Sequence, residues 1–325
     1  MRAMASTIRD VHKEARRAAF PEITAGGPLS VPALPVEKTL VHRARLRDVL
    51  PTQLTRHDDT HFTVSARRPR THRLFVTADG QGTASLVLET IRQTTLLVSH
   101  AELGVPLGHH FVMWDLCHRL DARLLTRTAA NEDLTLDVRV ADLRRRGAVP
   151  TSVHLEMVLR AGGRAVGSGS IRFHVTSPAA YARIRGHLPA LGDAPVAEPV
   201  DPTAVHHSQA CDVALSPAEG PGRWLLRADP ANELFFDRVN DHVPAMVLVE
   251  AAQQAAHLTF PAGRFDPSAS EMRFSRYVEF GTPCRVAAHA VTTEDGTASI
   301  GVTGHQDEHL AFVIRFDGAT ARQER

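Results

Sequence analysis

The sequence of 325 residues is poor in cysteine, in net charge and in long apolar runs. Its three cysteines, Cys117, Cys211 and Cys284, are odd in number and widely spaced, which predicts free thiols in a reducing cytoplasm. No segment approaches the ~18 apolar residues that a membrane-spanning helix needs, and the N-terminus lacks the apolar core of a signal peptide. The net charge of +1, with both signs mixed along the chain, gives no indication of a nucleic-acid partner.

Several sequence motifs of catalysis are also absent. There is no Walker loop and no dinucleotide fingerprint, and Gly167-Ser-Gly-Ser170 does not match the Gly-x-Ser-x-Gly pattern of serine hydrolases. The pairs His109-His110 and His206-His207 lack the helical HxxxH spacing and the cysteine pairs of zinc sites. We therefore expect no metal and no bound cofactor.

Two apolar segments that each contain a glutamate are the most informative part of the chain. Leu86–Val98 is apolar on nearly every side, which predicts a helix that is buried all round. Met246–Ala256 repeats the pattern, and Glu250 corresponds to Glu89 at an offset of 250 − 89 = 161 residues. A glutamate inside a buried helix is unfavourable unless it is paired. Two of them at equivalent places predict an internal duplication.

Strand-like segments surround both helices. In the first half, strands are expected at Thr39–Leu46, Phe62–Ala66, Leu74–Val76, Phe111–Trp114, Leu134–Val140, Val153–Leu159 and Arg164–Val175, with a polar loop at Arg47–Thr60. In the second half, they are expected at Trp224–Arg227, Met272–Phe280, Cys284–Thr292, Ala298–Thr303 and Leu310–Phe316. One helix followed by several antiparallel strands, twice over, predicts an α+β fold.

Composition suggests four parts of the chain. A charged helix over Ser6–Phe20 and a linker rich in proline and glycine form an N-terminal arm over residues 1–35. The expected first repeat covers residues 36–180, a linker covers 181–208, and the second repeat covers 209–325.

Glu89 and Glu250 have two interpretations. A lone buried glutamate is usually structural, but a desolvated carboxylate also has a raised pKa and can act as a general base or acid. Arg92 lies three residues after Glu89, so it could bind a carboxylate or phosphate, or simply neutralise Glu89. His242, two residues before Pro244 at the start of the second helix, is either a catalytic group or a turn residue.

Several motifs together resemble the A-factor-type γ-butyrolactone and butenolide synthases of actinomycetes. They are Leu88–Gln93, Ser99–His109, Met113–Asp115, Phe235–Asp237, Asp241–Pro244 and Val249–Ala255. The resemblance spans Val36–Gly318 and implies a tandem hot-dog fold, in which each repeat is a long central helix wrapped by an antiparallel sheet.

The resemblance also implies an acyltransferase that condenses a β-ketoacyl thioester with dihydroxyacetone phosphate. The thioester would be carried on acyl carrier protein or coenzyme A, no membrane would be involved, and a homodimer is a further option. The expected catalytic residues are Glu89, Glu250 and His242, and the expected substrate-binding residues are Arg92, Gln93, Gln253, Gln254, Arg273 and Arg276.

The second helix departs from the family pattern. Gln253 stands where the family commonly has arginine, and Ala245 replaces the glycine that commonly follows Pro244. The missing arginine removes one candidate phosphate ligand, for which Arg273 or Arg276 could substitute. Two alternatives therefore stay open, namely a hot-dog enzyme with another acceptor, such as a thioesterase, and a non-catalytic acyl-binding protein. If one site binds phosphate, we expect it to be the one nearer Arg92.

Overall fold

The computed structural model describes residues 36–76, 82–121, 133–187, 196–238, 240–260, 265–292 and 297–320. The expected N-terminal helix at Ser6–Phe20 and the linker after it lie outside these residues. Within the described part of the chain, no helix is long and apolar enough to cross a membrane.

The strands of both halves form one antiparallel twelve-stranded sheet. The first half supplies β1 (Pro51–Arg56), β2 (His61–Ala66), β3 (His110–Leu120), β4 (Leu134–Arg146), β5 (Val149–Ala161) and β6 (Arg164–Thr176). The second half supplies β7 (Leu215–Pro217), β8 (Arg223–Leu226), β9 (Phe265–Phe274), β10 (Cys284–Thr292), β11 (Thr297–Gln306) and β12 (His309–Thr320). The spatial order is β1-β2-β4-β5-β6-β3-β9-β12-β11-β10-β8-β7. Each half has the same strand order, which confirms the predicted duplication.

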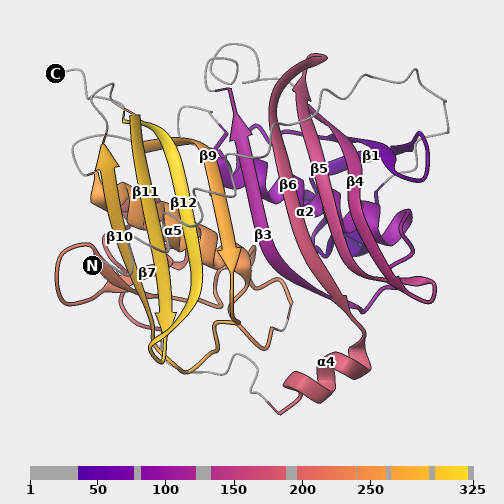
Figure 1. Cartoon of the computed structure of the whole chain (residues 1–325). Helices are drawn as coiled ribbons and strands as arrows, with labels where there is room; N and C mark the ends of the chain where they lie inside the picture. Colours follow the sequence, from indigo (N-terminus) through magenta and orange to yellow (C-terminus); the bar gives the residue numbers. More distant parts are fainter. Residues whose placement is uncertain are drawn as a thin grey trace.

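The two glutamate segments form the central helices α2 (Ala84–Ala101) and α5 (Ala245–Thr259). Both lie on the same face of the sheet, each behind its own half (Figure 1). Leu88, Ile91 and Val98 of α2 are fully buried. Gly169 of β6 permits the close contact, because a Cβ atom there would lie only 2.5 Å from Cδ1 of Ile91. The predicted α+β hot-dog architecture is therefore confirmed.

The segment before β1 differs from the prediction. The strand expected at Thr39–Leu46 is wrong, because short 3-10 helices form at η1 (Lys38–Val41) and η2 (Leu46–Asp48). The loop expected at Arg47–Thr60 is also wrong, because it contains β1. The apolar residues here pack onto α2 from turns, so hydrophobicity alone did not distinguish turn from strand.

Three other predicted strands differ in extent. Leu74–Val76 is mainly a turn that ends in one bridge to Gly82, and β9 begins and ends earlier than Met272–Phe280. β3 extends well beyond the short run Phe111–Trp114.

The connection between the repeats contains a helix, α4 (Pro178–Arg185). It lies beyond the end of β6, away from the sheet (Figure 1). The next elements, η3 (Pro202–Val205) and η4 (Ala210–Asp212), are the counterparts of η1 and η2. The expected repeat boundary between residues 208 and 209 thus falls after η3, and the domain limits stay a prediction.

Candidate active site

Glu89 is the centre of a buried ionic cluster in the first repeat. It has no solvent exposure. Arg43, which follows η1, donates two hydrogen bonds to Oε1 at 3.1 and 2.5 Å. Arg92 donates one to Oε2 at 2.8 Å and one to Oε1 at 2.7 Å. The pairing of Glu89 with Arg92 is thus present, while a role of Arg92 in anion binding remains a prediction.

This cluster keeps Glu89 ionised. Burial on its own would raise the pKa of Glu89, but Arg43, Arg92 and the Gln93 amide outweigh it and lower the pKa to about 2. The expectation of a raised pKa is therefore wrong for this residue, because the sequence indicated Arg92 beside it but not Arg43. A carboxylate with so low a pKa is a weak proton acceptor.

Gln93 and Gln254 have equivalent structural contacts. The Gln93 amide accepts a hydrogen bond from the Leu50 backbone NH at 2.8 Å and donates to the Asp48 carbonyl at 2.8 Å. Gln254 accepts from the Ala214 backbone NH and donates to the Asp212 carbonyl, both at 2.8 Å. Each glutamine thereby fixes the turn that leads into the first strand of its repeat, a task that occupies its amide group.

Glu250 has different partners from Glu89. His207 occupies the place of Arg43, at an offset of 164 residues, and its Nε2 lies 2.7 Å from Glu250 Oε1. Ser85 of α2 donates to Glu250 Oε2 at 3.3 Å, and Gln253 donates to the Ser85 hydroxyl at 2.6 Å. Burial acts to raise the pKa of Glu250, but the His207 hydrogen bond and charge lower it. A raised pKa is not found here either.

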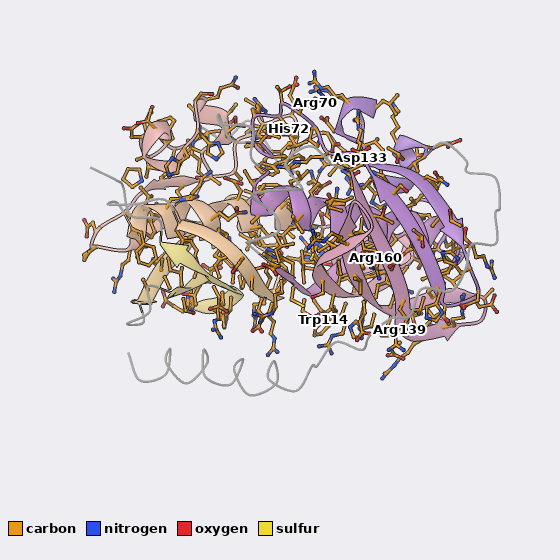
Figure 2. The ribbon with its side chains drawn as sticks, turned by 90° about the horizontal axis from the view of Figure 1, so that it is seen from above. Arg70, His72, Trp114, Asp133, Arg139 and Arg160 are labelled. Carbon is orange, nitrogen blue, oxygen red and sulfur yellow. The ribbon has the colours of Figure 1, made fainter. Side chains whose placement is uncertain are left out.

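A cavity of about 780 Å³ lies between the two repeats, a size typical of small-molecule sites. Arg43 and Arg92 reach it from the first repeat, and the segment from Leu234 to Leu248 reaches it from the second. Its apolar wall includes Leu96, Phe111, Met113, Ile171, Phe173, Met246 and Phe274. Trp114 also lines it and is 51% exposed, on the side of the molecule opposite His72 (Figure 2).

The polar end of the cavity carries excess positive charge. Arg43 also donates to the Leu234 carbonyl at 2.5 Å and lies 3.6 Å from Asp237. The side chain of Arg238 lines the same cavity, and its guanidinium group makes no hydrogen bond to another described residue. Partial desolvation in the cavity, Arg92 and Arg43 lower the pKa of Arg238, although a guanidinium group stays charged. Three guanidinium groups thus face two carboxylates, those of Glu89 and Asp237, which suits an anionic ligand.

The N-terminus of α5 opens onto this cavity. Its N-cap is Pro244, which provides no side-chain hydrogen bond, and Pro244, Ala245 and Met246 all line the cavity. By contrast, the Thr83 hydroxyl caps α2 by accepting from the Leu86 NH at 3.3 Å. The uncapped amides of α5 are available to a negatively charged oxygen.

His242 lies at the mouth of the same helix. Its Nδ1 lies 2.8 Å from Asp241 Oδ1, and the residue lines the cavity. Burial lowers the pKa of His242, with Asp241 acting against it. His242 is therefore neutral near pH 7 and can accept a proton.

The structure places three of the predicted site residues, Arg92, His242 and Arg276, on the cavity wall. Glu89 lies behind Arg43 and Arg92, and neither it nor Glu250, Gln93, Gln253, Gln254 or Arg273 is among the lining residues. Within the described residues, no group of three histidine, cysteine or acidic side chains could hold a metal.

Sequence reasoning missed Arg43, Asp237 and Arg238. Arg43 could have been found by extending the repeat, since His42-Arg43 and His206-His207 match at an offset of 164 residues. His42 and His206 share the left-handed backbone conformation.

Comparisons with known proteins agree with this architecture. The family described as the A-factor biosynthesis hotdog domain matches residues 28–177 and 190–310. A 2-oxo-3-(phosphooxy)propyl 3-oxoalkanoate synthase from Streptomyces virginiae is 40% identical over 279 residues, covering 85% of this chain and 95% of the relative. A protein of the same name from Streptomyces coelicolor is 36% identical, covering 88% and 92%.

A solved structure described as an oleoyl thioesterase from Lactobacillus plantarum has a TM-score of 0.51 at 13% identity. The match covers 82% of this chain and 99% of that one, and it supports the double hot-dog fold. The chain therefore belongs to the A-factor biosynthesis hotdog family.

Proposed function

We propose that this protein transfers the acyl group of a β-ketoacyl thioester to a hydroxyl of dihydroxyacetone phosphate, within the cavity between the repeats. The names of its relatives describe this product class, a 2-oxo-3-(phosphooxy)propyl 3-oxoalkanoate. The observation that carries the proposal is the convergence of Arg43, Arg92 and Arg238 at one end of an otherwise largely apolar cavity.

The phosphate would bind to these arginines. Arg92 and Arg43 are held by Glu89, whose carboxylate is engaged by both guanidinium groups and by Gln93. We therefore assign Glu89 to the positioning of the two arginines and assign the proton transfer to another group. Gln253 lies at the other glutamate, away from this cavity, so the loss of the family's arginine there leaves the phosphate site intact.

The acyl chain would lie along the apolar wall, with the thioester carbonyl toward the N-terminus of α5. The hydroxyl oxygen of the triose phosphate attacks the carbonyl carbon while His242 Nε2 takes its proton. The carbonyl oxygen gains negative charge that the free amides of α5 stabilise. The tetrahedral intermediate then expels the thiolate, which takes the proton from His242 and leaves as thiol. The ester product can afterwards close to a butenolide phosphate, when the methylene carbon of its β-ketoacyl group adds to the triose ketone and water is lost.

Thiol release tests this proposal. The protein is incubated with a β-ketoacyl coenzyme A and, separately, with dihydroxyacetone phosphate, unphosphorylated dihydroxyacetone or buffer alone. We expect rapid release only with the phosphorylated triose. Equal release in buffer would indicate a thioesterase, and equal release with the unphosphorylated triose would contradict the phosphate site. Absence of release in every arm, with tight acyl binding, would indicate a binding protein.

Three predictions made from the sequence are not decided by this experiment and stay predictions. They are the carrier, either coenzyme A or acyl carrier protein, the homodimer, and a catalytic role for Glu250. Repeating the assay with the same acyl group on both carriers would compare the two through kcat/KM.

A further inference from the structure

The helix in the connection between the repeats carries a buried arginine. Arg185, the last residue of α4, is only 5% exposed, although the residues around it are exposed. A buried guanidinium group on a short surface helix is unfavourable unless it is fully paired. The hydrogen-bond partners of Arg185 therefore indicate the role of α4.

Two of the three partners, Asp241 and Tyr277, line the cavity. Arg185 Nε donates to Asp241 Oδ2 at 2.7 Å, and its Nη atoms donate to the two Glu279 oxygens at 2.9 and 2.7 Å. The guanidinium group also lies 4.0 Å from the centre of the Tyr277 ring. From the same helix, the Tyr181 hydroxyl lies 2.9 Å from both Asp241 oxygens. Two side chains of α4 thus converge on one carboxylate.

Asp241 in turn fixes the protonation of His242. Burial would raise the pKa of Asp241, but its bonds to Arg185, His242 and Tyr181 hold the pKa well below its usual range. An ionised carboxylate only accepts hydrogen bonds, so His242 Nδ1 must be the donor at 2.8 Å. The lone pair of the neutral ring is then on Nε2, the other nitrogen of a residue that lines the cavity.

We propose that α4 is part of the active site, and that Arg185 and Tyr181 are positioning residues that hold Asp241 and thereby keep the Nε2 lone pair of His242 ready for the acceptor hydroxyl. This inference rests on the proposed function. The chain between the two repeats therefore does more than connect them, because it holds the carboxylate that orients the catalytic histidine.

The charge of Arg185 also acts on His242 directly. The titratable or charged groups that face His242 are its neighbour Asp241, Tyr181 and Arg185 from α4, His110 from β3, and Tyr277 and Glu279 from the segment after β9. Burial and Arg185 lower the pKa of His242, whereas Asp241 and Glu279 raise it. Removing the positive charge of Arg185 should therefore raise this pKa. Below its pKa the ring is an imidazolium and accepts no proton, so the acid limb of kcat should move to higher pH.

The pH profile of kcat in Arg185→Gln, Arg185→Lys and Arg183→Gln tests the inference. We expect the acid limb of Arg185→Gln to move upward by about one pH unit and kcat at neutral pH to fall about tenfold. Arg185→Lys, which keeps the charge, should restore the position of the limb. Arg183 lies on the same helix and is exposed, so Arg183→Gln should overlay the wild type. Coincident profiles of Arg185→Gln and Arg183→Gln would overturn the inference.

A measurement without substrate separates this inference from the proposed function. The imidazole ¹⁵N shifts of His242, assigned by their loss in His242→Gln, should show the Nδ1–H tautomer in the wild type. They should show mixed tautomers in Asp241→Asn. An Nε2–H tautomer in the wild type would overturn the inference even if the enzyme is active and even if Arg185→Gln fails to fold. The expected tautomer in a protein that releases no thiol would instead contradict the proposed function alone.

Discussion

The two repeats share a strand order and a central helix, yet their glutamates have opposite surroundings. Glu89 is held by two permanently charged arginines, and the cavity opens directly beyond them. Glu250 is held by a histidine and by the hydroxyl of Ser85 from the other helix. The duplicated backbone was therefore kept, while the charges placed on it diverged.

The difference suggests separate roles for the two glutamate clusters, one in substrate binding and one in holding the repeats together. At Glu89 the excess positive charge is directed at the cavity, which suits an anionic substrate. At Glu250 the polar groups satisfy one another across α2 and α5, which ties the repeats together. The N-termini of the two helices also differ. The Thr83 hydroxyl caps α2, whereas the first backbone amides of α5 have no side-chain cap and lie at the cavity.

The largest difference is expected in how much each glutamate contributes to the free energy of unfolding. Glu89→Gln leaves two buried guanidinium groups without their carboxylate and should reduce the free energy of unfolding by about 3–5 kcal/mol. Glu250→Gln should cost only about 1–2 kcal/mol, because His207 can lose its proton. Urea denaturation at pH 7 measures both, with the exposed pair member Glu308→Gln as control. Equal losses for the two variants would contradict the comparison.

Arg238, which lines the cavity, should matter for substrate binding. Arg238→Gln should raise KM for dihydroxyacetone phosphate about 10- to 100-fold, because a charge-assisted bond to the phosphate is lost. KM for the thioester should stay nearly constant. Arg273, which does not line the cavity, provides the control, and Arg273→Gln should change KM for the triose less than twofold. A similar KM rise in both variants would show that the effect is not local.

The histidine of the second cluster should make its stability depend on pH. Burial opposes the charged form of His207, but Glu250 raises its pKa above the usual value, so its extra stabilisation is complete below about pH 6.5 and is lost as the pH rises through the raised pKa. The stability difference between wild type and His207→Asn should thus shrink by about 1 kcal/mol toward alkaline pH. The Arg43–Glu89 pair should weaken only in acid, between about pH 4.5 and 2, as Glu89 takes up a proton. A difference that grows with pH would refute this assignment.

The helix caps should give the smallest effect. Thr83→Ala removes the hydroxyl that caps α2 and should lower the free energy of unfolding by about 1 kcal/mol. Since Thr83 does not line the cavity, kcat should remain within twofold of the wild type. Thermal unfolding and the thiol-release assay measure the two quantities. A large fall in kcat without loss of stability would place the α2 terminus in the reaction.

Much of the fold could be inferred from local pattern. The apolar runs around Glu89 and Glu250 predicted both central helices, and alternating residues predicted most of the strands of both halves. The prediction failed at η1, η2 and β1, where the segment is held by contacts to Gln93 and the cluster at Glu89. Such contacts join residues more than 40 positions apart, so no local periodicity reports them.

The site was predictable only in part. Arg92 was found because helical spacing places it beside Glu89, and His242 because it directly precedes a helix. Arg43 and Arg238 come from irregular segments on opposite repeats, and nothing near them in the sequence marks them as neighbours. Because Arg43 was missed, the pKa of Glu89 was predicted to shift in the wrong direction. With Arg92 as the only expected neighbour, burial was expected to raise the pKa.

The sequence by itself determined the duplication, the two buried glutamate helices and the family resemblance, because these depend on residue order and spacing along one element. Only the tertiary structure decided which glutamate holds the arginines of the cavity, which arginines gather there and what the connecting helix supports. Charges act across space, and a pKa depends on every group within a few ångströms, whichever part of the chain supplies it.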